Sequence, residues 1–125
     1  MANAVTTDKA REKMVKARAG DIALPRITHM VFGNGGVSNN MPIAPSGTDT
    51  ALKSETLRKP IDGHTYPSPT VCRYTVKLEK QELANDNINE VGLVDQDGDL
   101  VAIKTFMNKG KDSDMEMIFE IDDEF

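Results

Sequence analysis

Carboxylates that could bind a cation are concentrated in one short stretch of the chain, Asp95-Gln96-Asp97-Gly98-Asp99. Carboxylates at alternate positions are typical of a calcium-binding loop, which also requires glycine at its sixth position and a bidentate acid at its twelfth. Counted from Asp95, those two positions hold Leu100 and Phe106. Because Asp and Gly favour tight turns on stereochemical grounds alone, we interpret the stretch as a hairpin turn and expect no metal site. A calcium-binding module is the alternative.

Backbone amides that could hold a phosphate are suggested by the stretch Gly33-Asn34-Gly35-Gly36. A P-loop would continue with a Lys-Ser or Lys-Thr pair, and a dinucleotide fingerprint would have glycine where Ser38 stands. No helical pattern follows the stretch, so a phosphate there would lack the favourable helix dipole. We expect these glycines to serve chain reversal, with a small-ligand module built on residues 33–47 as the alternative.

Residue types suited to catalysis are scattered along the chain. His29, His64 and Cys72 include no pair at the spacing of metal ligands, and no serine has the context of a nucleophile elbow. No pair of carboxylates lies in an apolar surround that would raise one pKa for acid catalysis. We therefore expect no catalytic residue, no cofactor and no enzyme. The single cysteine also excludes an intrachain disulfide and favours a reducing site of synthesis.

Charge is distributed unevenly over the 125 residues, whose net charge is −5. Residues 9–18 carry five bases and one acid, whereas residues 112–124 carry seven acids and no base. An acidic chain of this kind is a poor candidate for nucleic-acid binding, which needs clustered Lys and Arg. The chain has neither a run of 18 apolar residues nor the apolar core of a signal peptide, so we expect no membrane association and synthesis in the cytoplasm.

The element that positions these residues is a central hairpin predicted over residues 90–106, with a type I′ turn at Asp97-Gly98. Its second arm has apolar residues on both faces, which is typical of a strand covered on both sides. Strict alternation places Leu100, Ala102 and Phe106 on one face. It places Val101 and Ile103 on the other.

The other predicted elements are arranged around this hairpin. Thr7–Ala19 is predicted as a helix that ends at Gly20, with a thin apolar stripe of Ala10, Met14 and Ala17. Further predictions are strands over 25–33, 57–61, 71–79 and 115–121, loops over 34–47 and 66–69, helical turns within 48–55, a turn over 108–112 and an acidic tail over 122–124. The fold class is therefore α+β and β-rich, an N-terminal helix followed by an antiparallel sheet or small sandwich with a central hairpin. We divide the chain into a basic amphipathic helix (1–20) and a single β-rich domain (21–125).

Several segments resemble one known family in order along the chain. Residues 27–36 read ITHMVFGNGG, residues 72–76 read CRYTV, residues 88–95 read INEVGLVD and residues 98–103 read GDLVAI. Together with residues 51–52, 55–61 and 115–125, they resemble the N-terminal domain of bacteriophage tail-fibre (tail-collar fibre) proteins. The resemblance runs from about Asp21 to Phe125, and the hairpin segment is its most specific part.

The resemblance implies a structural protein of the virion tail, assembled in the bacterial cytoplasm, that attaches a fibre to the baseplate of a phage tail or a tail-derived bacteriocin. It also implies other tail or baseplate proteins as partners and self-association, most simply as a trimer. A domain without catalytic residues, with bases clustered in residues 9–18 and acids in residues 112–124, suits such a role. Clustered charge of one sign orients the encounter with a partner. The basic helix is the expected docking surface, through Lys9, Arg11, Lys13, Met14, Lys16, Ala17 and Arg18.

Overall fold

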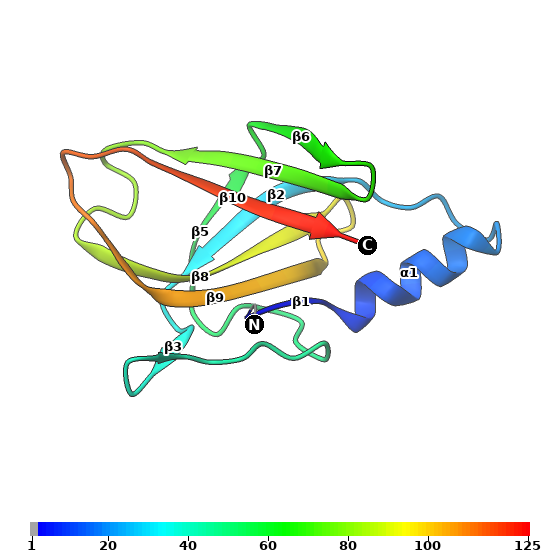
Figure 1. Ribbon diagram of the computed structural model, residues 1–125, viewed down its shortest axis with the longest axis horizontal. Helices are drawn as coiled ribbons and strands as arrows, with labels where there is room; N and C mark the ends of the chain where they lie inside the picture. Colours follow the sequence, from blue (N-terminus) through cyan, green and yellow to red (C-terminus); the bar gives the residue numbers. More distant parts are fainter. Residues whose placement is uncertain (1–2) are drawn as a thin grey trace.

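Two antiparallel sheets pack face to face in the computed structural model, which describes residues 3–125, and one helix projects from an end of the sandwich (Figure 1). The elements are β1 (Ala4–Thr6), α1 (Asp8–Arg18), β2 (Ile27–Gly33), β3 (Val37–Ser38), β4 (Met41–Pro42), β5 (Glu55–Pro60), β6 (Gly63–Ser68), β7 (Val71–Leu78), β8 (Asp86–Asp95), β9 (Leu100–Lys111) and β10 (Met117–Glu124). The larger sheet has the order β1-β9-β8-β2-β5, the smaller has β10-β7-β6, and β3-β4 is a short separate hairpin. The predicted β-rich α+β class is confirmed.

Helix α1 begins and ends at the signals that the sequence contains. Thr7 is its N-cap, and the Thr7 hydroxyl accepts a hydrogen bond of 3.2 Å from the backbone amide of Ala10. At the other end, Gly20 has φ of +86°, the left-handed conformation with which many helices stop. The predicted helix is therefore confirmed. The short strand β1 that precedes it was not predicted, because three residues carry too little periodicity to indicate a strand.

The predicted central hairpin is confirmed as β8 and β9, which lie side by side within the five-stranded sheet. One face of the sheet packs on the smaller sheet, and the Phe32 and Phe119 rings meet edge-on there, 5.2 Å apart. The opposite face is covered by the segment that links β2 to β5, which inserts Leu52 beside Val31 and Ile103. Burial on both faces explains why β8 and β9 are so apolar.

The hairpin turn differs from the predicted type I′ turn, which needs positive φ at both central residues. Only Gly98 has positive φ, +86°, and Asp97 does not. The Asp95 carbonyl accepts a hydrogen bond from Gly98 N at 2.9 Å, and Asp95 N donates to the Asp99 carbonyl at 3.0 Å. The connection is therefore a three-residue loop closed by a left-handed glycine, which is also common in hairpins.

The predicted faces of the second arm are correct for Ala102, Phe106 and Ile103 but wrong for Leu100 and Val101, because a bulge interrupts the alternation. Leu93 lies opposite Ala102 and Val94 lies opposite Leu100, which leaves Val101 as an extra residue in β9. Val101 and Ala102 consequently both pack in the core between the sheets, whereas Leu100 packs on the opposite face. One extra residue shifts every preceding side chain to the other face of a strand.

Four local predictions are corrected by long-range pairing. Residues 48–55 form no helical turn, because the amides of Lys53 and Ser54 bind a buried carboxylate of β8. Residues 66–68 belong to strand β6, whose edge position tolerates Pro67. The turn predicted over 108–112 is instead strand up to Lys111, which pairs with Asp86. The acidic tail over 122–124 is the end of β10, paired with β7.

Candidate functional site: helix α1 and the cleft at its base

The first turn of helix α1 is tied to the larger sheet by hydrogen bonds from consecutive residues. Thr7 donates from its hydroxyl to the Leu100 carbonyl at 2.8 Å and from its amide to the Val101 carbonyl at 3.0 Å. The amide of Asp8 donates to the Gly47 carbonyl at 2.7 Å. The helix therefore leaves the sandwich in a defined direction.

A buried lysine makes the second attachment of the helix. The Lys13 ammonium lies 2.6 Å from Asp95, 3.1 Å from Asp97 and 2.7 Å from Asp99. Burial opposes the charge of Lys13, but the hydrogen bonds that its ammonium donates to the three carboxylates outweigh burial and raise the Lys13 pKa. In turn, the hydrogen bond that Asp99 accepts from Lys13 holds the pKa of the Asp99 carboxyl below its ordinary value. The lysine thus offsets one of the three negative charges at the hairpin turn.

The same cluster is the one group of acids within residues 3–125 that is close enough to share a metal ion, with ligand atoms within 4.8 Å of one another. The Lys13 ammonium hydrogen-bonds to all three of these carboxylates. A divalent cation would have to displace an ammonium held by charge-assisted hydrogen bonds. The carboxylates that suggested a calcium loop are therefore engaged by a cation of the chain itself.

The glycine-rich stretch holds an anion, but that anion is also part of the chain. The buried carboxylate of Glu90 accepts hydrogen bonds from the amides of Gly35 and Lys53, both at 2.9 Å, and of Ser54 at 2.8 Å. Next to it, the side chain of Asn89 accepts one from Gly36 N at 2.7 Å. The stretch therefore fastens the loop after β2 to the central strand.

The seven predicted docking residues on α1 divide between an inner and an outer face. Lys13 points inward, and Met14 and Ala17 are partly buried. The outer face exposes the remaining four residues, which are Lys9, Arg11, Lys16 and Arg18. Val15, which sequence reasoning did not select, is 69% exposed among them. The structure thus presents a mainly basic face with one large apolar side chain, on which Lys16 pairs with the exposed acid Glu12 at 3.1 Å.

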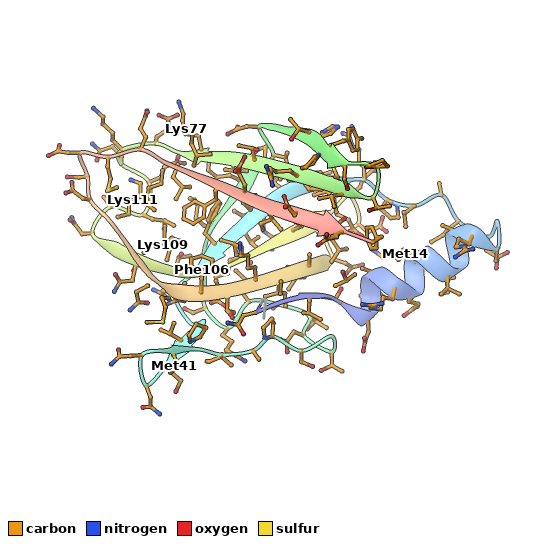
Figure 2. All side chains as sticks on the ribbon, in the orientation of Figure 1. Met14, Met41, Lys77, Phe106, Lys109 and Lys111 are labelled. Carbon is orange, nitrogen blue, oxygen red and sulfur yellow. The ribbon has the colours of Figure 1, made fainter. Side chains whose placement is uncertain are left out.

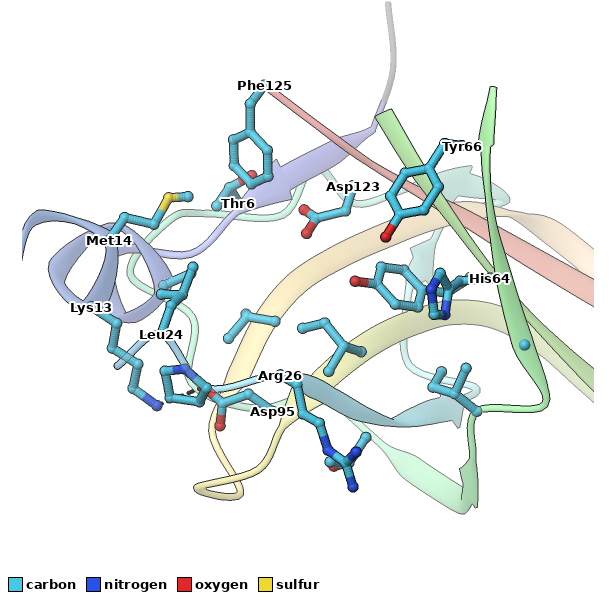
Figure 3. A pocket seen from close by; sticks show the side chains of 18 of the residues that line it. Thr6, Lys13, Met14, Leu24, Arg26, His64, Tyr66, Asp95, Asp123 and Phe125 are labelled. Atoms are coloured by element: carbon cyan, nitrogen blue, oxygen red, sulfur yellow. Dashed lines mark hydrogen bonds and ion pairs between the residues drawn. The ribbon is translucent and has the colours of Figure 1, made fainter. Parts of the chain in front are cut away.

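A cleft of about 790 Å³ lies at the base of the helix, where α1, residues 24–28, β6 and the end of β10 converge (Figure 3). Its apolar rim includes Leu24, Tyr66 and Phe125, which are 57%, 70% and 65% exposed. Met14 of α1 and the carboxylate of Asp123 also line it (Figure 3). Exposed apolar side chains around a concave surface are typical of binding sites.

The polar groups of the cleft include one histidine, two tyrosines and the carboxylate of Asp123. His64 packs against Tyr66 and Tyr74, with ring centroids 5.6 and 5.9 Å apart. Burial raises the pKa of the Tyr74 hydroxyl and also that of the Asp123 carboxyl. The described residues that line the cleft include neither serine nor cysteine that His64 could activate.

Sequence reasoning missed this cleft because its residues come from segments with no local pattern of a site. Tyr66 lay in a predicted loop, and Asp123 and Phe125 lay in or beside a predicted tail. The pairing of β10 with β7 brings them together, and neither the pairing nor the position of α1 is encoded in nearby residues. The separate Tyr66-Pro67 and Asp122-Asp123 stretches offered no signal that they meet.

Within the part of the chain that the structure describes, no helix is long and apolar enough to cross a membrane. The family model described as phage tail-collar fibre protein, N-terminal, matches residues 1–119. No curated protein and no solved structure matches the chain.

Proposed function

The chain belongs to the family of phage tail-collar fibre proteins, whose N-terminal domain it matches, and we propose that it attaches a tail fibre or adaptor to the baseplate of a phage tail or tail-like particle. The observation that carries this proposal is the basic outer face of α1, which projects from the sandwich beside an apolar-rimmed cleft (Figures 1 and 3). The domain has a structural role in the tail and acts without catalysis.

The partners of the helix in this proposal are other tail or baseplate proteins. Lys9, Arg11, Lys16 and Arg18 would orient the encounter with an acidic surface, since rim charges mainly affect association rate and register. Affinity would come from apolar contact with Val15 and with the rim of the cleft. Lys13 holds the helix in place and is not itself part of the contact surface.

Self-association, most simply as a trimer, is the second part of the proposal. It is supported by apolar side chains that follow the helix, since Ile22 is 39% exposed and Leu24 is 57% exposed. A helix of 11 residues anchored mainly through its first turns gains from a neighbour on its free side. We place assembly in the bacterial cytoplasm and the mature protein in the virion tail.

Charge reversal on the helix tests the attachment role. The variant Lys9→Glu/Arg11→Glu/Lys16→Glu/Arg18→Glu keeps Lys13, so the domain should fold while its incorporation into particles falls at least tenfold. A matched control reverses Lys53, Arg58, Lys80 and Lys109, which are also exposed but lie elsewhere. Of these, Lys109 lies toward the end of the sandwich away from α1 (Figure 2). Quantitative blotting of purified particles measures incorporation, and circular dichroism checks the fold. Normal incorporation of the helix variant would contradict the proposal.

A further inference from the structure

Among residues 3–125, strand β10 has one edge without a hydrogen-bonded neighbour, since it lies at the end of the order β10-β7-β6. Beside it, a groove of about 540 Å³ runs between β10 and the edge of the larger sheet formed by β1 and β9. Ala102 and Ile121 line this groove, and both belong to the core between the sheets. Thr6 and Asp123 line both this groove and the cleft, so the two are adjacent.

The other sheet edges are blunted in ways that β10 is not. Strand β1 has only three residues, β5 ends at Pro60, and β6 contains Pro67. Short edge strands and proline both prevent another strand from pairing. Strand β10 extends over eight residues, Met117–Glu124, without proline or glycine. It is therefore the sheet edge best suited to accept a further strand.

Four carboxylates and two cations, Arg73 and Lys104, line the groove, so its negative charge is only partly compensated. Arg73 of β7 pairs with Asp122 at 2.8 Å. Glu120, Asp123 and Glu124 form no ion pair with any of the described residues, 3–125. Glu120, Asp122 and Glu124 share the outer face of β10, whereas Asp123 lies on the other face. An added strand with basic side chains at alternate positions would therefore place cations beside Glu120 and Glu124, because side chains alternate between faces with period two.

We propose that β10 accepts an added β-strand from an extended, lysine- or arginine-bearing segment of another tail protein. Main-chain hydrogen bonds would supply affinity, and the carboxylates would select a basic sequence. The source of the segment rests on the proposed function, whereas the strand-accepting property of β10 does not.

A second copy of β10 is a poor occupant of its own edge. Antiparallel pairing of two β10 strands centred on Ile121 would place Glu120 of one copy opposite Asp122 of the other. Like charges directly opposite each other destabilise a strand pair. The alternative role for these acids is protection of the edge against any pairing, which charged edge residues often provide. Peptide binding separates the two roles.

Titration of the purified full chain with three eight-residue peptides tests the proposal. The peptides are (Lys-Val)₄, (Glu-Val)₄ and a (Lys-Val)₄ analogue with proline replacing two valines. We expect (Lys-Val)₄ to bind and to slow amide hydrogen exchange in β10. We expect the other two to bind at least tenfold more weakly, because one is repelled and the other lacks strand amides. Equal binding of the proline analogue would mean charge attraction alone and would overturn the proposal, as would absence of binding.

Variants of the chain locate the site. Glu120→Lys/Glu124→Lys should weaken (Lys-Val)₄ binding at least tenfold, whereas Asp114→Lys, an exposed acid outside β10, should leave it unchanged. Equal affinity in all three proteins would overturn the assignment to β10. These titrations involve neither particles nor the basic face of α1. Their failure is therefore distinguishable from a failure of the attachment proposal, which the helix variant tests.

Discussion

The Lys13 ammonium lies 2.6 Å from the Asp95 carboxylate, 82 positions away in the chain, and so joins helix α1 to the central hairpin. The Asp95 side chain is 2% exposed, which means that removal of Lys13 would leave a buried carboxylate without its cation. The orientation of the basic helix therefore depends on this contact. The first three predictions concern the lysine and the turn that it binds.

Replacing Lys13 by methionine should lower the free energy of unfolding by about 2–3 kcal/mol. Removing one partner of a fully buried pair costs about 3–5 kcal/mol, and the partial exposure of Asp97 and Asp99 reduces that figure. Urea titration measures the change. The matched control is Lys16→Met on the same helix, which removes only an exposed pair with Glu12 and should change stability little. Equal effects of the two substitutions would contradict the role given to Lys13.

Chelation should leave the melting temperature unchanged, because the Lys13 ammonium engages all three carboxylates of the hairpin turn. Differential scanning calorimetry in EDTA and in millimolar calcium measures this. A melting temperature that falls by several degrees in EDTA and recovers with calcium would contradict our interpretation. It would favour the calcium-binding alternative instead.

Acid should remove the stabilisation that Asp99 provides. The folded-state pKa of Asp99 lies below the unfolded value of about 3.9, so the unfolded chain binds its proton first as the pH falls. The contribution is present above about pH 4 and is lost as the pH falls through the folded-state pKa. Asp99→Asn should flatten the profile of unfolding free energy over this acidic range. A profile parallel to that of the natural protein would show that Asp99 is not coupled to Lys13.

Asp123 should show the opposite dependence on pH, because burial raises its pKa in the folded protein. Between the unfolded pKa, about 3.9, and the raised folded value, the folded chain binds more protons, so stability declines as the pH rises through this range. The unfolding free energy of Asp123→Asn, compared with that of the natural protein at the same pH, should therefore be more favourable at pH 7 than at pH 4. Asp114→Asn, which changes an exposed acid, is the control. A gain that is independent of pH would contradict the assignment.

Gly98→Val should destabilise the protein by about 1 kcal/mol or more, since a β-branched residue is strained at the φ of +86° observed there. A Cβ at Gly98 would contact nothing within 4 Å, so the strain is in the backbone alone. Gly63→Val is the matched control, because Gly63 has equally open surroundings without positive φ. The stability of Gly98→Asn should lie between those of Gly98→Val and Gly63→Val, because asparagine tolerates the left-handed region. Equal stability of the two valine variants in urea would contradict this assignment.

Local patterns were sufficient to predict the elements that carry their own signals. Thr7 and Gly20 delimit the helix, and the alternation after Val71 identified β7 correctly. The bulge at Val101 could not be predicted, because it adds one residue without changing the apolar composition of the strand. The contact of Lys13 with Asp95 was also inaccessible, since a basic helix usually presents such a lysine to solvent. The cleft required knowledge of how β10 pairs.

Strand β1 pairs with β9 so that Thr6 lies opposite Ala102, and the Thr7 hydroxyl bonds to a carbonyl 93 positions further along. During synthesis, residues 4–7 therefore leave the ribosome long before residues 100–104, with which they pair. Pairing over such a sequence separation is slow, because loop-closure entropy opposes it. Helix α1 is held in its final orientation only after the hairpin of β8 and β9 exists. The orientation of α1 therefore depends on strands that are made almost a hundred residues after it.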